Sequence, residues 1–221
     1  MYIVENLTKK YSSRRSAVTA LDSISVAVKR GSFVTITGDS GSGKTTLLLT
    51  LGGLIRPSSG KVLFEGKNLY DYTNEELATF RNRKVGFVLQ TFNLVPYLNA
   101  LENVILPMLF APGSNGGAQS RGQELLARLG LADREDHLPR ELSIGQQQRV
   151  AIARALANDP DVILADEPTG NLDPSLSEEI LDILGSLHRE AKKTVVMVTH
   201  SPSAAKRAEI ILRLNQGALE S

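Results

Sequence analysis

Apolar positions along this chain follow two patterns, and each predicts a different kind of strand. Near the N-terminus, Ile24, Val26 and Val28 alternate with other residues, as in a strand with one buried face. Continuous apolar runs instead predict strands buried on both faces. The apolar runs lie at residues 33–36, 85–89, 162–165, 194–198 and 210–214. A further, shorter strand is predicted at 61–64.

Helical signals lie between the strand-like runs. Thr73 is followed by Glu76 three positions later, which marks a helix start, and Gly130 marks a helix end. Strands that alternate with helices predict a mainly parallel sheet with helices on both faces. The expected helices are residues 46–54, a segment beginning after Thr73, a segment carrying Leu125, Leu126 and Leu129, and a segment after Pro174.

Residues 91–159 have a different character from the rest of the chain. Pro96, Pro107 and Pro112 interrupt their first part, and residues 113–117 are predicted to be a surface loop. We therefore expect one α/β domain over residues 1–221. Its core is expected at about 1–90 and 160–221, with an antiparallel β subdomain at the N-terminus and a helical subdomain inserted at about 91–159.

Composition excludes several classes of protein. With 42% hydrophobic and 22% charged residues, the 221-residue chain is globular rather than disordered. A net charge of +1 argues against nucleic acid as a partner, although Lys9, Lys10, Arg14 and Arg15 form a local basic cluster. The chain has no cysteine, no apolar run long enough to span a membrane and no pattern typical of a signal peptide. These features predict a cytoplasmic protein.

A phosphate-binding loop follows the apolar run at 33–36. The segment fits G-x-x-x-x-G-K-[ST] and stands between a predicted strand and a predicted helix, as phosphate binding requires. Its glycines allow backbone N–H groups to surround phosphates, Lys44 is predicted to reach the β- and γ-phosphates, and the Thr45 hydroxyl is a predicted Mg²⁺ ligand. The predicted nucleotide-binding residues here are Gly38, Asp39, Ser40, Gly41, Ser42, Gly43, Lys44, Thr45 and Thr46.

Three other strands are each followed by a polar residue suited to nucleotide hydrolysis. The run at 162–165 leads to Asp166, a predicted Mg²⁺ ligand, and to Glu167, which is predicted to orient the attacking water. Gln90 and His200 each follow an apolar strand and are expected at the same edge of the sheet. There Gln90 is predicted to contact Mg²⁺ and the water, and His200 to hydrogen-bond the γ-phosphate.

A second anion site is predicted at the start of a different helix. Ser143 and Gln146 have the spacing of a capping box, in which each side chain satisfies a backbone N–H at the helix start. The remaining N–H groups and the helix dipole favour an anion there. Two phosphate sites on separate elements indicate that two chains close over shared ATP.

In this order, these motifs resemble those of the ATP-binding subunits of ABC transporters, and the resemblance covers essentially the whole chain. It implies a P-loop NTPase (RecA-like) fold, ATP and Mg²⁺ as ligands, and ATP hydrolysis. It also implies a head-to-tail homodimer in which Ser143, Gly145 and Gln146 of one chain face the phosphate-binding loop of the other. In that dimer Asp173 communicates across the interface, and Tyr11 stacks on adenine.

Within the family, the chain is most similar to the subgroup of lipoprotein release, MacB-type efflux and the FtsE-type division complex. The motifs that carry this likeness are 86–88, 93–94, 101–104, 106–107 and 165–173. It implies a separate transmembrane permease subunit, a location on the inner face of the cell membrane, and export or extraction of a lipoprotein, drug or peptide. Residues 92–109 are then expected to border the groove for the membrane subunit, or equally to be core.

Two residues depart from the family pattern. The family usually has Gly where this chain has Ile144, and a β-branched residue there is expected to resist a positive φ and to add bulk at the dimer face. Ser201 stands where Asp is common after the switch histidine, which is expected to loosen the surroundings of His200. Two other functions remain open: an FtsE-type regulatory ATPase that transports nothing, and a soluble ABC ATPase acting on DNA or ribosomes.

Overall fold

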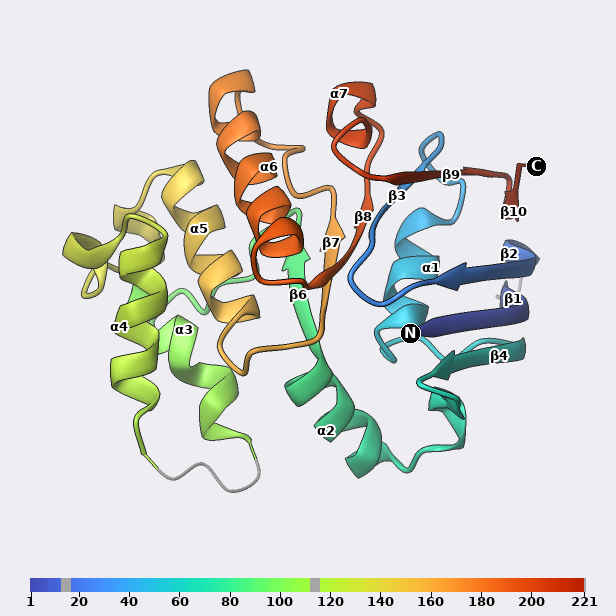
Figure 1. Ribbon diagram of the computed structural model, residues 1–221, viewed down its shortest axis with the longest axis horizontal. Coiled ribbons are helices and arrows are strands. Elements are labelled where there is room, and N and C mark those ends of the chain that lie inside the picture. The colour runs from blue at the N-terminus through green and yellow to red at the C-terminus, as the bar shows by residue number, and fades with distance from the viewer. Residues whose placement is uncertain (13–16, 112–115, 221) are drawn as a thin grey trace.

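A six-stranded, mainly parallel sheet forms the centre of the molecule in a computed structural model (Figure 1), which describes residues 1–12, 17–111 and 116–220. Its order is β10-β9-β3-β8-β7-β6, in which β10 alone runs antiparallel to its neighbour. The strands are β3 (Phe33–Thr37), β6 (Val85–Leu89), β7 (Val162–Asp166), β8 (Thr194–Val198), β9 (Ile210–Asn215) and β10 (Ala218–Leu219). The predicted parallel sheet is confirmed.

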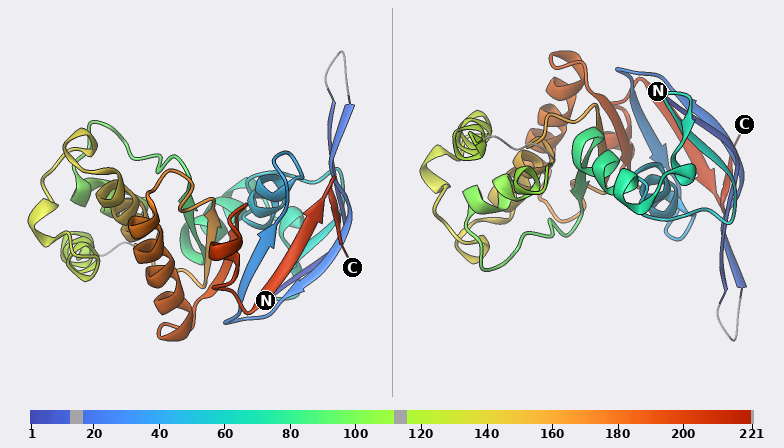
Figure 2. Two further views of the ribbon diagram at one scale, coloured as in Figure 1. Left: turned by 90° about the horizontal axis from the view of Figure 1, so that it is seen from above. Right: turned by 90° about the horizontal axis from the view of Figure 1, so that it is seen from below.

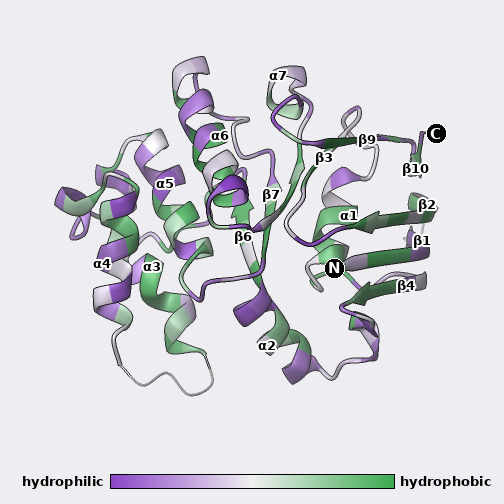
Figure 3. Ribbon diagram, viewed as in Figure 1, coloured by the Kyte–Doolittle hydropathy of each residue, from purple (hydrophilic) through white to green (hydrophobic). Residues whose placement is uncertain are grey.

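A four-stranded antiparallel sheet, with the order β2-β1-β4-β5, covers one side of the molecule. One face of this sheet is buried, and the register shifts between β1 and β2 interrupt strict alternation of inward and outward residues. Helix α1 (Lys44–Leu51) contacts both β2 and β8, and its buried leucines join the two sheets in one core (Figure 3). The strands are β1 (Tyr2–Ser12), β2 (Ala17–Val28), β4 (Ser59–Phe64) and β5 (Lys67–Asn68).

Side chains cap the starts of several helices. The predicted capping boxes at Thr73/Glu76 and Ser143/Gln146 are present, and a third one, at Asn99/Glu102, begins a helix that the proline pattern had obscured. The helices are α2 (Asn74–Lys84), α3 (Ala100–Leu109), α4 (Ala118–Arg128), α5 (Ile144–Ala155), α6 (Pro174–Arg189) and α7 (Pro202–Ala205). Single 3-10 turns lie at Leu69–Asp71, Ala132–Arg134 and Pro139–Glu141.

Helices α3, α4 and α5 pack together at the end of the molecule opposite the β1–β2 pair (Figure 2). They share an apolar core with α6 and with one face of the parallel sheet. Asn103 is fully buried, and its side-chain amide donates to the Val95, Leu98 and Asn99 carbonyls, so it holds the segment after β6 against α3. Of the predicted loop and basic cluster, residues 113–115 and 14–15 lie outside the described part of the chain.

Asp161 connects three elements at the amino end of the parallel strands. Its carboxylate accepts from Lys84 at the end of α2 at 2.7 Å and from Arg30 in the turn before β3 at 3.1 Å. Partial burial tends to raise the pKa of Asp161, but the hydrogen bonds and charges of Lys84 and Arg30 outweigh that effect and hold the pKa below its ordinary value.

We therefore expect Asp161→Asn to destabilise the protein at neutral pH. A lowered folded pKa contributes stability above the ordinary aspartate pKa of about 3.9, and this contribution disappears as pH falls through the folded value. The expected loss in the free energy of unfolding is at most about 1 kcal/mol, because the cations are half-exposed. Urea unfolding at neutral and acidic pH measures it. Asp159→Asn, at an exposed pair with Lys193, is the control; equal losses in both variants would contradict the assignment.

Candidate active site

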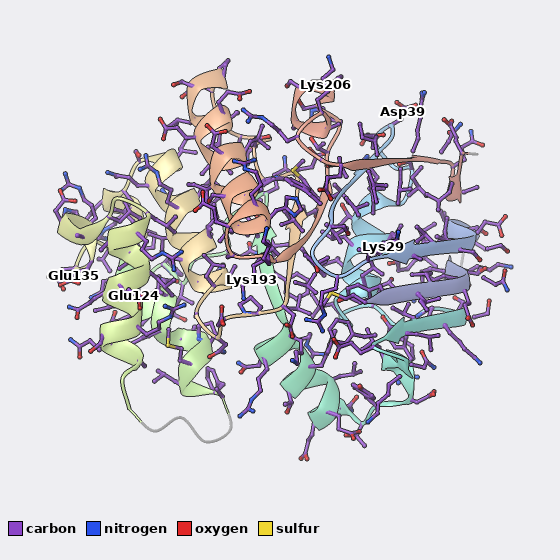
Figure 4. All side chains as sticks on the ribbon, in the orientation of Figure 1. Lys29, Asp39, Glu124, Glu135, Lys193 and Lys206 are labelled. Carbon is purple, nitrogen blue, oxygen red and sulfur yellow. The ribbon has the colours of Figure 1, made fainter. Side chains whose placement is uncertain are left out.

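A cavity of about 970 Å³ lies at the carboxyl edge of the parallel strands. Asp39 and Lys206, both near this edge, are labelled in Figure 4. All the residues predicted to act in hydrolysis line this cavity except Asp166. Asp166 accepts a hydrogen bond from Thr45, which does line the cavity. The lining side chains of predicted function are Asp39, Ser40, Lys44, Thr45, Thr46, Gln90, Glu167 and His200, together with the backbone of Gly38, Gly41 and Gly43.

The phosphate-binding loop passes closely between its neighbours on either side. A Cβ at Gly38 would lie 2.1 Å from the Leu214 carbonyl oxygen, and one at Gly43 would lie 2.2 Å from that of Ala20. Both glycines also have positive φ, so no other residue fits this path without strain. In addition, the Gly217 N–H donates to the Ser42 carbonyl at 3.0 Å. The loop therefore has a defined shape before any ligand binds.

The start of α1 provides donors for an anion. Gly43 occupies the N-cap position and offers no side chain, so the first backbone N–H groups of the helix have no cap. Lys44, which is 8% exposed, donates from Nζ to the Gly38 and Asp39 carbonyls at 2.8 Å each. Its charge thus lies inside the curve of the loop, where a phosphate can replace the two carbonyl partners.

Asp166 ends β7 beside the first turn of α1. The Thr45 hydroxyl donates to Asp166 Oδ1 at 3.0 Å, which brings together two oxygen ligands that the sequence separates widely. Burial raises the pKa of Asp166, and the neighbouring Glu167 charge adds to this, while the Thr45 hydrogen bond and the Lys44 charge oppose it. The net effect is a pKa above the ordinary value. In the free chain this carboxylate is therefore held in an environment that disfavours its charge.

Glu167 and His200 form a pair across the ends of β7 and β8. The distance between Glu167 Oε1 and His200 Nδ1 is 2.9 Å, and the His200 backbone N–H donates to Oε2 at 3.4 Å. Glu167 has a φ of 45°, and its N–H continues the sheet by donating to the Val198 carbonyl. Its carboxylate is mostly buried, whereas the imidazole is 69% exposed. The arrangement places the Glu167 carboxylate directly beside the His200 imidazole at the edge of the cavity.

Gln90 follows β6 and approaches the turn after β7. Its carbonyl accepts from the Asn171 side chain at 3.1 Å, and a Cβ at Gly170 would lie 2.9 Å from Gln90 Nε2. Its side chain therefore faces the same cavity as Glu167 and His200. Gln90 is exposed, so a ligand or a partner chain can move it at little expense in packing.

The predicted second anion site lies apart from this cavity. Ser143 Oγ accepts from the Gln146 N–H at 3.2 Å, and Gln146 Oε1 accepts from the Ser143 N–H at 2.9 Å, so the capping box is complete. Gly145 is buried against Leu176 of α6. Asp173 caps α6 by accepting from the Ser175 and Leu176 N–H groups. The nucleotide cavity of the same chain is lined by none of these four residues, Ser143, Gly145, Gln146 and Asp173.

The structure corrects the expectation about Ile144. It is the first residue of α5, and it has no positive φ, so its β-branched side chain causes no backbone strain there. The glycine that the fold requires is the next one, because a Cβ at Gly145 would lie 2.9 Å from the Leu176 side chain. The other part of the expectation, added bulk at the dimer face, stays a prediction, and the apolar Ile144 side chain is 52% exposed.

Ser201 does not loosen the end of β8. Its hydroxyl caps α7 by accepting from the Ala204 N–H at 3.4 Å, and its own N–H donates to Thr199 Oγ1 at 3.0 Å. Serine is as good an N-cap as aspartate, so the substitution keeps the local structure after His200. The expected loosening around the His200 side chain stays a prediction.

Tyr11 lies on β1, opposite Val18 of β2, outside the residues that line the cavity. Its ring is 43% exposed, and Lys9 Nζ lies 4.9 Å from the ring centroid. The ring is thus a free aromatic surface with a cation beside it. Its role toward adenine stays a prediction.

The motif analysis did not identify two residues that hold segments beside the cavity in place, Gln148 and Arg154. Gln148 is fully buried and donates to the Pro168 carbonyl at 2.7 Å, which joins α5 to the turn after β7. Arg154 donates to the Phe92 and Asn93 carbonyls at 2.5 and 2.6 Å, and burial lowers its pKa. Gln148 lies on the apolar face of α5 with Ile152, and this helical spacing was the signal that marked it as buried.

Comparisons with known proteins confirm the predicted fold class and the resemblance. A family model described as ABC transporter matches residues 21–170. An ATP-binding protein LolD of a lipoprotein-releasing system, from Chromohalobacter salexigens, is 45% identical over 97% of this chain and 91% of its own length. An uncharacterized ABC transporter ATP-binding protein of Thermotoga maritima is 51% identical over 96% of this chain and 90% of its own length.

A longer relative and a solved structure extend this comparison. The macrolide export ATP-binding/permease protein MacB of Syntrophobacter fumaroxidans is 47% identical over 98% of this chain, which spans 31% of that protein's length. The dimeric structure of a post-hydrolysis state of the ATP-binding cassette MJ0796, bound to ADP and Pi, is 44% identical. It superimposes with a TM-score of 0.93 over 100% of this chain and 97% of its own. Within the described residues, no helix has the length and apolar character needed to cross a bilayer.

We expect Asp166→Asn to make the ligand-free protein more stable at neutral pH. When a folded pKa is raised, the associated stability is complete below the ordinary aspartate pKa of about 3.9 and is lost as pH rises through the folded value. Asparagine removes the charge that the folded site disfavours, and its Oδ1 can still accept from Thr45. Urea unfolding of the ligand-free variant should show a gain at neutral pH that vanishes in acid. Asp161→Asn, which should act in the opposite direction, is the control. Destabilisation by Asp166→Asn at neutral pH would contradict this account.

Proposed function

The chain belongs to the ABC transporter family of ATP-binding proteins, and from this premise we propose that it hydrolyses ATP to drive a separate transmembrane permease. The observation that carries the proposal is the single cavity around which Lys44, Glu167, Gln90 and His200 converge. The proposed location is peripheral, on the cytoplasmic face of the cell membrane. Residues 91–159 are proposed to form the helical subdomain that presents the start of α5.

ATP binding uses the phosphate-binding loop. The backbone N–H groups of 38–46 surround the phosphates, and Lys44 exchanges its two carbonyl partners for phosphate oxygens. Thr45, Asp166 and Gln90 would hold Mg²⁺, and the direct contact between the Thr45 hydroxyl and the Asp166 carboxylate supports this, since Mg²⁺ prefers oxygen ligands. When bound, Mg²⁺ neutralises negative charge on the phosphates.

Hydrolysis is assigned to Glu167 and His200. Glu167 orients the attacking water and accepts its proton, and a carboxylate suffices for this because phosphoryl transfer depends mainly on positioning and electrostatics. His200 donates a hydrogen bond to the γ-phosphate. Because Nδ1 of the imidazole is paired with Glu167, the γ-phosphate would accept from Nε2, and the pair stays in place when ATP binds.

A second copy of the chain is proposed to complete the site. The start of α5 carries a capped set of donors, but it does not line its own cavity, so it is available to the ATP of a partner chain. The solved relative MJ0796 forms a dimer with ADP and Pi, which supports this arrangement. In the proposed dimer of this chain, the phosphates are contacted across the interface by Ser143, Gly145 and Gln146. Asp173 lies near the interface, and Tyr11 stacks on adenine.

The membrane partner is proposed from the relatives. LolD belongs by name to a lipoprotein-releasing system, and MacB is by name a macrolide export protein with a permease in the same chain. These names favour export or extraction of a lipoprotein, drug or peptide over the division-type regulatory role. They also favour it over a soluble ATPase acting on DNA or ribosomes. The substrate itself is selected by the permease.

Glu167→Gln should abolish turnover while preserving ATP binding. Loss of the base is expected to lower the hydrolysis rate by at least about 100-fold. An ATP-bound dimer should then accumulate, visible by size-exclusion chromatography with light scattering. Glu190→Gln, at an exposed position at the end of α6, is the matched control. Undiminished phosphate release by Glu167→Gln would remove Glu167 from the mechanism.

Ile144→Gly tests the bulk at the proposed dimer face. Removing the exposed side chain should increase turnover by roughly threefold, a change of less than about 1 kcal/mol in the barrier. The same change should lower stability by about 0.5 kcal/mol, because glycine is a poorer helix former. Ile144→Ala should raise turnover without that loss of stability. If neither variant exceeds the unmodified protein in steady-state hydrolysis, the side chain does not hinder closure.

A further inference from the structure

A second cleft, of about 320 Å³, lies between α6 and α7, next to the nucleotide cavity. Glu167 and His200 line both hollows, so their hydrogen-bonded pair is the partition between them. Figure 1 shows α7 above the end of β8 and α6 beside β7 on the left of it. The mechanism described so far uses only the nucleotide side of this partition.

The lining of the cleft suits water and disfavours an anion. Its polar groups are hydroxyls, the His200 imidazole and two carboxylates, those of Glu167 and Glu178, and no lysine or arginine is among the described lining residues. A polar hollow with several hydrogen-bonding groups holds water readily, whereas a phosphate would need cationic partners. The hydroxyls belong to Thr169, Ser177, Thr199, Ser201 and Ser203.

The cleft extends from the protein surface to the buried end of β8. Glu178 and Ser203 at its outer part are exposed, whereas Thr199 and Ala204 at its inner part are fully buried or nearly so. An ion-pair cluster fixes its width, because Arg207, just after α7, pairs with Glu178 and Asp182 of α6, the latter at 2.8 Å. The two helices are thus held at a set separation.

We propose that this cleft supplies the attacking water to Glu167. The inference rests on the proposed ATPase function and adds a route to it. When ATP fills the nucleotide cavity and a partner chain covers it, the approach from that side is closed. Glu167 also lines the second cleft, so water in that cleft can still reach its carboxylate through the same chain.

The reaction consumes one water for each ATP. The water oxygen forms a bond to the γ-phosphorus, and the bond from that phosphorus to the bridging oxygen breaks, so ADP leaves with the bridging oxygen and the electron pair. The water proton passes to Glu167 and then to solvent or to a phosphate oxygen. Each turnover therefore requires a new water beside Glu167, and the cleft can deliver it while both nucleotide sites are covered.

Ser177→Leu tests the route by filling the cleft. Ser177 lies in α6, and its hydroxyl makes only a long contact of 3.5 Å to the Leu172 carbonyl, so leucine keeps the helix and adds bulk. We expect kcat to fall by about tenfold, with the KM for ATP within about twofold of normal. Ser177→Ala, which removes the hydroxyl without filling space, should retain most of the kcat. Ser186→Leu, the same substitution later in α6 and outside the cleft, is the matched control.

Oxygen exchange distinguishes water supply from phosphate release. In ¹⁸O-labelled water, a variant that retains phosphate has more time for reversal and incorporates additional label, whereas a variant starved of water does not. We expect Ser177→Leu to release phosphate with no more label than the unmodified protein. Label above that level would overturn the proposal in favour of a phosphate exit.

Three other results bear on the proposal. An unchanged kcat in Ser177→Leu would overturn it. A fall in kcat together with loss of the ATP-dependent dimer in the Glu167→Gln background would also overturn it, because the leucine would then act on assembly. Absence of ATP hydrolysis by the unmodified chain would instead refute the proposed function on which the inference rests.

Discussion

One rung of the parallel sheet determines where every reacting group lies. Ile36, Val198, Asp166 and Leu89 pair in a single register across four strands. The next residues along each strand must therefore emerge at one level, since parallel strands share a carboxyl edge. The phosphate-binding loop, Glu167, Gln90 and His200 are thus neighbours because the strands are in register, although long stretches of sequence separate them.

In the free chain, the side chains with predicted roles in ATP binding and hydrolysis are held by partners within the protein. Lys44 is bonded to two loop carbonyls, Asp166 to the Thr45 hydroxyl and Glu167 to His200. A buried or half-buried charge without such partners would destabilise the free chain. The free site is consequently ordered before any ligand binds.

The site shows which local patterns are reliable guides. The capping box of Ser143 and Gln146 was predictable because both residues belong to one helical turn, and their bonds depend on no other part of the chain. The expectation for Ile144 was wrong because it treated the position as a turn with positive φ, whereas the capping box already makes it the first helical residue. The capping of α7 by Ser201 was not expected from the sequence, because that short helix had no predicted start.

The sequence by itself determined most of the strands and helices, the phosphate-binding loop and the family, because each depends on residues that are close together along the chain. It did not predict β1 (Tyr2–Ser12) or the short strands β5 and β10. Only the tertiary structure decided the buried hydrogen bond from Gln148 to Pro168, the ties from Arg154 to the segment after Gln90, and the cleft behind Glu167. These features join segments that are distant in sequence. Residue spacing carries no information about which distant backbone groups meet, and packing of α5, α6 and α7 against the sheet settles it.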